Sequence, residues 1–329
     1  MLRRYFVLFT LLGCSFAPLL LNAADSKGDT FTDPDKAGVD YTIQGEYVGT
    51  LKTPDGEQKW GTQVIALGAG KFKAIGFKGG LPGDGWKRGD DTHESEGELK
   101  DGVASFKADE VSVAIKDGVA KVMLDGNSIG EMKKVERKSP TLGAKAPEGA
   151  MVLFDGTNAD KWNNGQVTED KLLKANNPDT KEKFGDHTLH IEFRTPFMPT
   201  ARGQGRGNSG VYLQSRYELQ VLDSFGLTGE NNECGGIYSI SKPNVNACLP
   251  PLAWQTYDIE FKAAKYDDAG KKTENARATI KHNGIVIHDN LELTHGTPGR
   301  HPEGPGPDAI YLQDHGNPVV YRNIWVVKK

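Results

Sequence analysis

Residues 209–223, SGVYLQSRYELQVLD, alternate apolar and polar side chains through two short runs. Successive side chains of a β-strand point to opposite faces of a sheet, so one face of each run is apolar and the other is polar. The pattern predicts two neighbouring strands that bury one face in a core. Their polar face is predicted to carry Tyr212, Gln214, Arg216, Glu218 and Gln220.

The same alternation recurs over residues 151–329. Short runs rich in β-branched and aromatic residues follow one another at regular spacing, and Asn283-Gly284 has the composition of a two-residue hairpin turn. Only residues 168–174 have the composition of a short helix. About 180 residues of this kind predict an all-β domain, a sandwich of two antiparallel sheets.

The preceding residues form a second unit. Residues 41–136 alternate in short runs separated by Gly or Asp-Gly turns, which predicts a smaller antiparallel sandwich or barrel. Residues 137–150, RKSPTLGAKAPEGA, have the composition of a linker. We therefore predict one β domain of unknown role over residues 25–140 and another over residues 147–329, with few contacts between them.

The first 24 residues have the features of a secretory signal peptide. Arg3 and Arg4 precede an apolar run over residues 5–21, and small residues precede a cleavage site near Ala23-Ala24. The alternatives are a membrane anchor, for which the run is short, and a lipoprotein acylated at Cys14. We expect an exported chain, periplasmic or extracellular, with no membrane span after cleavage.

The net charge and the cysteine content restrict the class of protein further. Removing residues 1–24 takes two of the 40 basic side chains and none of the 44 acidic ones, leaving 38 and 44, a net charge of −6. An acidic chain of this kind is not predicted to bind nucleic acid. Cys234 and Cys248 remain and predict a disulfide, worth roughly 3 kcal/mol for a loop of this length. The alternative is a pair of buried free thiols.

The polar faces suggest a ligand. Tyrosine, glutamine and arginine form planar hydrogen-bonding surfaces suited to polyhydroxylated molecules, whereas an ordinary solvated face, the alternative, carries more lysine. Asn208 comes from a glycine-rich loop beside the first strand, and Trp254 follows two prolines, where it could stack on a sugar ring or pack in the core. Two further runs, residues 190–194 and 310–315, are predicted to add His190, Glu192, Arg194, Tyr311, Gln313 and His315.

Five segments together resemble one family. They are GNSGVYLQSRYELQVLDSFG, CGGIY, WQTYDIEF, NGIVIHDN and YLQDHGNPVVYRNIW. In this order they resemble the 3-keto-disaccharide hydrolase family over residues 147–329. The resemblance implies a concanavalin A-like, jelly-roll β-sandwich. It also implies an enzyme that cleaves glycosides already oxidised to a ketone at sugar carbon 3, so that the partner is an oligosaccharide or glycoside.

Such a reaction needs a base for the proton on carbon 2, a group that stabilises the enolate and an acid for the leaving oxygen. We predict that Glu218 and His315 share the proton transfers and that Asp314 orients the turn that carries His315; the alternative packs His315 on Tyr321. The sequence requires no cofactor and leaves a divalent metal open. The predicted substrate-binding residues are Arg194, Asn208, Tyr212, Gln214, Gln220, Tyr238, Trp254 and Gln313.

Two other functions stay open at this point. Sandwich glycosidases that hydrolyse unoxidised sugars carry E-x-D-x-E or E-x-D-x-x-E on one strand. Here Gln220 occupies the position of the middle acid. Alternation along the strand places the side chain of Asp223 on the opposite face from that of Glu218. Direct hydrolysis by Glu218 and Asp223 is therefore an alternative, and a non-catalytic, lectin-like carbohydrate-binding protein is the other.

Overall fold

The structure, a computed structural model, describes residues 28–329. The predicted signal peptide, its cleavage site near Ala23-Ala24 and Cys14 lie outside these residues. Within the described part of the chain, no helix combines the length and hydropathy needed to cross a membrane.

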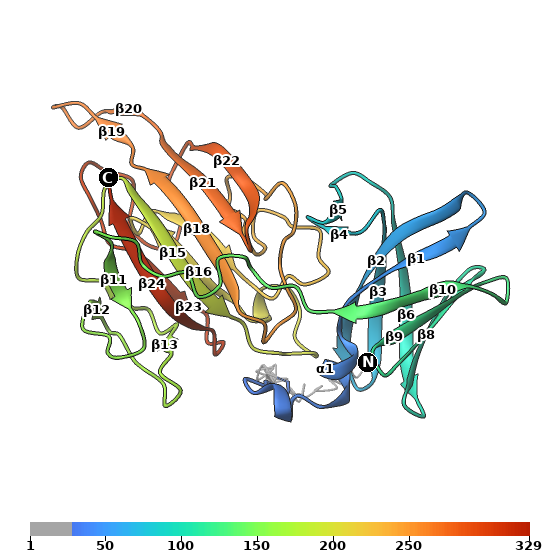
Figure 1. The fold of residues 1–329 in the computed structure, drawn as a ribbon. Helices are drawn as coiled ribbons and strands as arrows, with labels where there is room; N and C mark the ends of the chain where they lie inside the picture. Colours follow the sequence, from blue (N-terminus) through green and yellow to red (C-terminus); the bar gives the residue numbers. More distant parts are fainter. Residues whose placement is uncertain (1–27) are drawn as a thin grey trace, which may run out of the picture.

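The first part of the chain closes into an eight-stranded antiparallel barrel (Figure 1, blue to green). Its tight turns use Asp-Gly pairs such as Asp117-Gly118 and Asp125-Gly126, in which both residues have positive φ, as a two-residue hairpin of this type requires. A small parallel pair, β4 (Leu81–Pro82) and β5 (Gly85–Trp86), follows the third strand. The barrel consists of β1 (Gly45–Thr53), β2 (Gly56–Gly68), β3 (Lys71–Lys78), β6 (Thr92–Lys100), β7 (Val103–Ala108), β8 (Val111–Lys116), β9 (Val119–Leu124) and β10 (Asn127–Val135).

Two short helices that the sequence analysis did not predict precede the barrel. They are η1 (Pro34–Lys36), capped by the Asp33 carboxylate, and α1 (Gly38–Ile43). Ile43 packs into the barrel core together with Phe197 of the second domain. The segment therefore closes one end of the barrel (Figure 1).

Residues 151–328 form a two-sheet sandwich (Figure 1, green to red), which confirms the predicted all-β class. One sheet has seven strands: β11 (Met151–Phe154), β13 (Leu173–Lys174), β24 (Val320–Lys328), β15 (His187–Arg194), β18 (Gln255–Lys262), β21 (Ala276–His282) and β22 (Ile285–Leu293). The other has five: β12 (Trp162–Asn163), β14 (Asp179–Thr180), β23 (Tyr311–Asp314), β16 (Ser209–Leu213) and β17 (Tyr217–Val221). A separate ribbon pairs β19 (Lys265–Tyr266) with β20 (Lys272–Glu274).

Residues 168–174 are not the predicted helix. The backbone of Thr168 pairs with Leu172 in a turn, Lys171 has a positive φ of 60°, and the chain then enters β13, which pairs with β24. The sheet edge thus supplies the backbone hydrogen bonds that a short helix would have had to make for itself.

The predicted core side chains lie between the two sheets. Ile191, Val211, Leu219 and Leu312 are fully buried in one cluster. However, β15 belongs to the seven-stranded sheet, whereas β16, β17 and β23 belong to the five-stranded sheet. The polar side chains of β15 therefore face the opposite side of the molecule from those of the other three strands.

The linker covers the polar face of β15 (Figure 1, green). The Thr141 hydroxyl donates to Asp258 Oδ2 at 2.6 Å, and the Gly143 amide donates to Glu192 Oε1 at 2.6 Å. His190 lies beneath, with its Nδ1 2.6 Å from Asp258 Oδ1. This polar cluster holds the linker against the sandwich.

The barrel and the sandwich contact each other directly. The Arg88 guanidinium donates to four backbone carbonyl oxygens of the sandwich at 2.8 to 3.2 Å. Beside it, Ile65, Ile75 and Phe77 on the outside of the barrel pack against Phe225. No strand of the barrel joins a sheet of the sandwich among the described residues.

The predicted disulfide is not formed, because Cys234 and Cys248 are both free thiols buried in the core. The Cys234 thiol lies 3.2 Å from the Tyr257 hydroxyl, and the Cys248 thiol donates to the Leu249 carbonyl at 3.4 Å. Each sulfur has a polar partner within an apolar core, so both are accommodated as buried thiols.

Arg137 fixes the point where the chain leaves the barrel. It donates to both oxygens of Glu46, at 2.6 and 2.5 Å, and to the Pro82 carbonyl at 2.8 Å. The Glu46 side chain is only 1% exposed. We expect Arg137→Ala to lower the free energy of unfolding by about 3–5 kcal/mol, because it leaves a buried carboxylate without its charge partner.

Urea unfolding followed by tryptophan fluorescence measures this loss. The double variant Arg137→Ala/Glu46→Gln should recover much of it, since it also removes the uncompensated charge. Equal stabilities of the single and double variants would show that the pair does not act as described.

Candidate active site

A tight hairpin sets the register of the five-stranded sheet. Gln214 and Ser215, between β16 and β17, both have positive φ, at 52° and 51°. Neither residue is a glycine, and local hydrogen bonds support the turn: Gln214 Nε2 donates to Phe184 O at 2.9 Å, and Ser215 Oγ to Ala309 O at 3.1 Å. The turn places Tyr212 directly opposite Glu218.

Two cross-strand rows follow from this register. Tyr311, Tyr212 and Glu218 stand opposite one another on β23, β16 and β17, and Gln313, Gly210 and Gln220 form the next row on the same face. Alternation had predicted the shared polar face of these strands, and the structure confirms it. The one position of the two rows that lacks a side chain is Gly210.

Gly210 makes room for the carboxyl group of Glu218. A Cβ atom at this position would lie 2.5 Å from Glu218 Oε1 and 3.0 Å from Gln313 Oε1. A Cβ atom at position 210 would therefore force the Glu218 carboxyl group to move away from its present place. The Glu218 carboxyl group and the Gln313 amide therefore converge over the backbone of Gly210.

Burial controls the protonation of Glu218. The residue is only 4% exposed, and desolvation raises the pKa of its carboxyl group from 4.5 to about 7. The Tyr212 hydroxyl, 3.0 Å from Oε2, opposes this rise but does not cancel it. Burial beside Glu218 also raises the pKa of Tyr212, so its phenol stays protonated at neutral pH and remains a donor.

The amide side chains around Glu218 have unused hydrogen-bonding capacity. Gln220 Nε2 donates to Asn208 Oδ1 at 3.1 Å, and Gln313 Nε2 contacts the Tyr212 hydroxyl at 3.4 Å. Within residues 28–329, the buried oxygens Gln220 Oε1 and Gln313 Oε1 have no hydrogen-bond partner. An unsatisfied buried acceptor is costly, and ligand hydroxyl groups would satisfy both.

A loop after β22 reaches across this face. Thr297 Oγ1 accepts the Glu218 amide at 2.9 Å, and the Pro298 carbonyl lies 3.1 Å from the Tyr212 hydroxyl. Arg300 stacks on the Tyr311 ring at 4.0 Å and pairs with Asp179. The loop therefore covers the cluster and fixes the edge strand β17.

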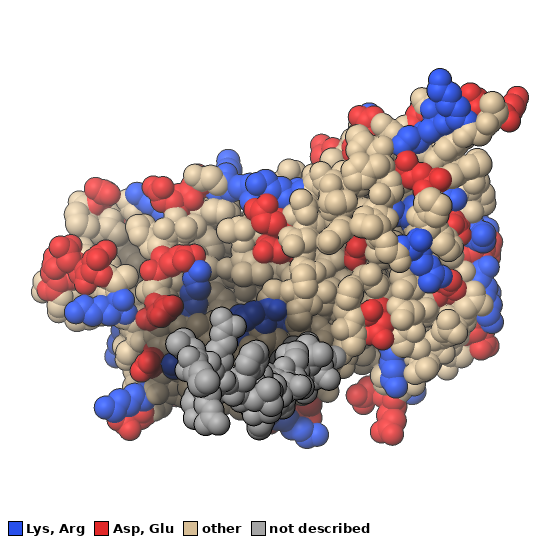
Figure 2. Space-filling model, turned by 180° about the vertical axis from the view of Figure 1, so that it is seen from behind, with Lys and Arg blue, Asp and Glu red and all other residues tan. Residues whose placement is uncertain are grey.

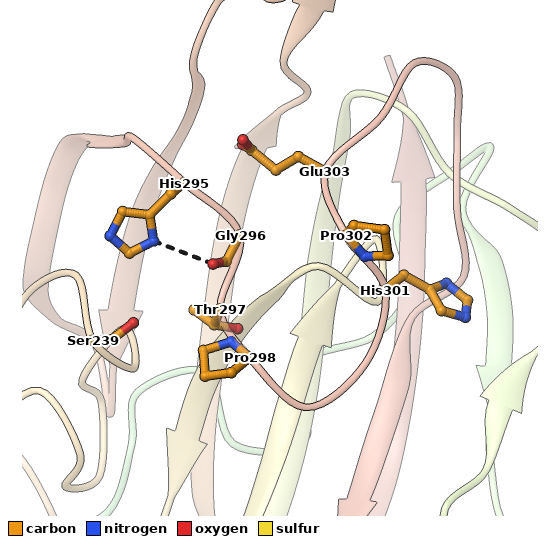
Figure 3. A pocket seen from close by; sticks show the side chains of 8 residues that line it. All are labelled: Ser239, His295, Gly296, Thr297, Pro298, His301, Pro302 and Glu303. Atoms are coloured by element: carbon orange, nitrogen blue, oxygen red, sulfur yellow. Dashed lines mark hydrogen bonds between the residues drawn. The ribbon is translucent and has the colours of Figure 1, made fainter.

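A pocket of about 460 Å³ opens on the same loop and shares Thr297 and Pro298 with the cluster. In Figure 3, His295 and Ser239 stand on one side of the loop and His301 on the other. The pocket is lined by Ser239, His295, Gly296, Thr297, Pro298, His301, Pro302 and Glu303.

His315 does not reach Glu218. β23 ends at Asp314, and His315 lies exposed on the turn that follows; within residues 28–329 it makes no hydrogen bond or ring contact with Glu218 or Tyr321. Asp314 Oδ1 accepts the Gly316 amide at 2.5 Å, so Asp314 orients the turn as predicted. Asn317 then ties the turn to the site by accepting the Asn208 amide at 2.7 Å.

Three predicted binding residues lie elsewhere. Arg194 and Trp254 meet on the outer face of the seven-stranded sheet, where the guanidinium lies 5.1 Å from the Trp254 ring and Arg322 stacks on it at 3.9 Å. Gln214 sits in the hairpin turn and holds Arg216. The predicted residues that gather around Glu218 are Asn208, Tyr212, Gln220, Gln313 and Tyr238, whose amide donates to the Glu218 carbonyl at 3.1 Å.

Asp223 is not available as a second catalytic carboxylate. Arg206 Nε donates to Asp223 Oδ2 at 2.6 Å, and both side chains are buried. Asp223 also lies outside β17, which ends at Val221. The pair required for direct hydrolysis is therefore not formed.

The sequence analysis missed Gly210 and the loop over residues 297–300. A glycine within an alternating strand is a signal of close approach, and it could have indicated Gly210. No sequence signal placed the Gly/Pro-rich loop over Glu218, because that contact depends on tertiary structure. Among the described residues, no group of three or more His, Cys, Asp or Glu side chains is placed to hold a metal ion.

Comparison with known proteins identifies the family. Residues 149–327 match the model of the 3-keto-alpha-glucoside-1,2-lyase-like domain, which spans more than half of the chain. The chain belongs to this family and carries a domain of a carbohydrate-active class. A comparison with curated proteins gives no match.

Solved structures from Parabacteroides distasonis ATCC 8503 are similar. One, described as a "putative glycosyl hydrolase", is 34% identical with a TM-score of 0.51, over 56% of this chain and 85% of that one. Two others with the same description are 17% and 20% identical, with TM-scores of 0.41 and 0.39; they cover 55% of this chain each and 94% and 99% of their own.

The raised pKa of Glu218 has a measurable effect on stability. The unfolded carboxyl group ionises near 4.5, whereas the folded one keeps its proton until about pH 7. Between these values the folded state binds more protons, so stability falls as the pH rises. We expect Glu218→Gln to raise the free energy of unfolding by roughly 3 kcal/mol at pH 8 and to leave it nearly unchanged at pH 4.

Urea denaturation at the two pH values tests this expectation. Glu260→Gln is the matched control, because Glu260 is exposed on β18 and should give no comparable pH-dependent gain. A Glu218→Gln variant that is less stable than the wild type at pH 8 would contradict the assigned burial of the charge.

Proposed function

We propose that this protein cleaves 3-keto glycosides by eliminating the group attached to sugar carbon 1, with Glu218 as the base. The observation that carries the proposal is the Glu218 carboxyl group itself, which is buried over Gly210, has a pKa of about 7 and stands beside unpartnered amide oxygens. Family membership supports a glycoside as the substrate.

The reaction follows from the ketone. A carbonyl group at carbon 3 acidifies the proton on carbon 2, and the Glu218 carboxylate accepts that proton. The electrons of the C2–H bond form an enolate, which expels the oxygen on carbon 1 as a C1–C2 double bond forms. The products are an unsaturated keto sugar and the protonated aglycone, and water then adds to the double bond.

The amide and phenol groups of the face bind the sugar. Tyr212 is held as a donor by its raised pKa, and Gln220 and Gln313 offer both donors and acceptors. We propose that these three side chains bind the sugar hydroxyls and the ketone oxygen. Negative charge develops on the ketone oxygen during the reaction. Asn208 orients Gln220, and the loop over residues 297–300 excludes water from the bound sugar.

Two groups are needed for the proton transfers on an α-glucoside. In that configuration the proton on carbon 2 and the oxygen on carbon 1 project from opposite faces of the ring, so one carboxyl group cannot serve both. We assign protonation of the leaving oxygen to His315, on the exposed turn after Gln313, which would approach the ring from the side away from Glu218.

Binding without cleavage is the remaining alternative, because a lectin can also use a polar sheet face. The carboxyl group favours the enzyme. A binding site gains nothing from a buried acid that titrates near neutrality, whereas a general base works best when its pKa lies near the working pH.

Turnover of 4-nitrophenyl 3-keto-α-glucoside beside its unoxidised parent tests the reaction. We expect cleavage of the keto form, with kcat/KM rising with pH to a plateau above a midpoint near 7, because only ionised Glu218 is a base. Glu218→Gln should lower kcat by about 10²–10⁴-fold, and the control Glu260→Gln should not. Retained turnover in Glu218→Gln, or faster cleavage of the unoxidised parent, would overturn the proposal.

The leaving group separates the role of His315 from that of Glu218. His315→Ala should lower kcat by about 10²-fold on a methyl 3-keto-α-glucoside, whose alcohol needs a proton, and only a few-fold on the nitrophenyl compound. Glu218→Gln should impair both substrates equally. An equal rate of His315→Ala and wild type on the methyl glycoside would assign that proton to water.

We also propose that residues 1–24 direct export and are removed. The supporting observation is the basic, apolar and small-residue order of this segment. Amino-terminal sequencing of the secreted or periplasmic protein should begin at Asp25. An intact amino terminus in the cytoplasmic fraction would contradict it.

A further inference from the structure

The barrel is hollow over part of its length. A cavity of about 670 Å³ lies inside it and is lined by side chains from all eight strands. Its walls are largely apolar and include Leu51, Phe106, Val113, Val122 and Leu124. This size falls within the range of small-molecule sites.

The residues that point inward explain the hollow. Toward one end the interior is filled by Tyr47, Phe72 and Phe106, which are nearly or fully buried. Toward the other end the inward positions of β3 become small, with Ala74 followed by Gly76. Eight strands leave an interior that side chains just fill when they are large, so small ones leave space for a ligand.

The cavity is closed at one end only. Ala37 and Ile43 of the amino-terminal segment pack on the filled end together with Phe197 and Leu252 from the sandwich. The hairpin residues Thr53–Asp55 and Asp109–Glu110 line the other end, which points away from the sandwich (Figure 1). A molecule can therefore enter without disturbing the junction of the two domains.

The rim of the cavity is acidic. Four carboxylates line it against one lysine, Lys78, and a fifth acid, Glu94, also borders the cavity but is paired with Lys73. Acidic side chains are also prominent over the outer end of the barrel, at the left of Figure 2. A negative rim disfavours an anionic ligand such as a fatty-acid carboxylate. The four carboxylates are Asp55, Asp91, Asp109 and Glu110.

One hydrogen-bond donor in the wall has no partner. Trp60 lines the cavity, and its buried Nε1 donates to no group among the described residues. The ring of His93 packs against it with the centroids 5.4 Å apart. An indole N–H buried in an apolar wall normally finds an acceptor, and a ligand can supply one.

We propose that the barrel binds a neutral, largely apolar small molecule that carries a carbonyl or ether oxygen, with this oxygen accepting the hydrogen bond of Trp60 Nε1. The apolar wall binds the body of the molecule, the acidic rim selects against anions and the indole orients the polar end. This site is separate from Glu218, and the inference does not depend on the proposed function.

Prodan, a neutral naphthalene ketone whose emission depends on its surroundings, is the probe for the full chain. We expect a blue shift on binding with a Kd in the micromolar range, roughly −8 kcal/mol. Val113→Phe, which fills the cavity, should weaken binding by at least about 10-fold. Ala114→Phe is the matched control, because Ala114 is the exposed neighbour on the same strand, and it should bind as the wild type does.

Two further measurements sharpen the test. Trp60→Phe keeps an aromatic wall but removes the donor, so bound Prodan should lose its hydrogen-bond-dependent red component as its affinity falls. Dodecanoate should displace Prodan at least about 10-fold less well than dodecan-2-one does. If Val113→Phe does not fold, judged by circular dichroism, Ser95→Leu fills the same cavity from β6.

Three results would overturn the inference. They are no Prodan binding to the wild type, equal affinity of the cavity-filling variant and Ala114→Phe, and displacement by dodecanoate as strong as by the neutral ketone. The first would leave the barrel without a ligand of this class, the second would place the probe elsewhere, and the third would refute selection by charge.

Discussion

The placement of one carboxyl group over one glycine governs this site. Glu218 lies on a strand whose other face is packed into the sandwich core, so it cannot move away from its neighbours without disturbing Leu219. Gly210 supplies the space, the hairpin sets the register and the loop over residues 297–300 covers the cluster. Together they hold an acid where its charge is poorly solvated, and its pKa rises to about 7 as a result.

This arrangement opposes stability. An ionised carboxylate in such surroundings costs free energy at neutral pH, and the unpartnered oxygens of Gln220 and Gln313 add to that cost. The extensive apolar core between the two sheets offsets it. Unsatisfied polar groups around a titratable acid are expected at a ligand-binding site, because the ligand supplies the missing hydrogen-bond partners.

Alternation in the sequence predicted much of this architecture. It assigned the all-β class, the separate antiparallel unit before the linker and the inward and outward faces of β16, β17 and β23, and so brought Glu218, Tyr212, Gln220 and Gln313 to one surface. It could not say which strands share a sheet. Arg194 was therefore grouped with Glu218, although β15 lies in the opposite sheet and its polar face binds the linker.

Turns, and contacts between residues far apart in the sequence, could not be predicted from alternation either. His315 lies two residues after Gln313, so alternation predicted that both side chains share one face. The strand ends at Asp314, however, and alternation does not apply beyond the end of a strand. The contact of Thr297 with Glu218 joins residues about 80 positions apart in an irregular loop, and no local pattern encodes it. The two cysteines illustrate the same point, because composition alone indicated a disulfide, whereas both residues are buried in the core as free thiols.

The central claim concerns the ionisation of Glu218, and the most direct measurement is its carboxyl titration. The protein labelled with ¹³C at glutamate side-chain carboxyls, compared with Glu218→Gln, identifies the resonance of this residue. We predict that its chemical shift titrates with a midpoint of about 7. A midpoint near the ordinary value of 4.5 would show that the carboxyl group is solvated, and would contradict its assignment as a buried base.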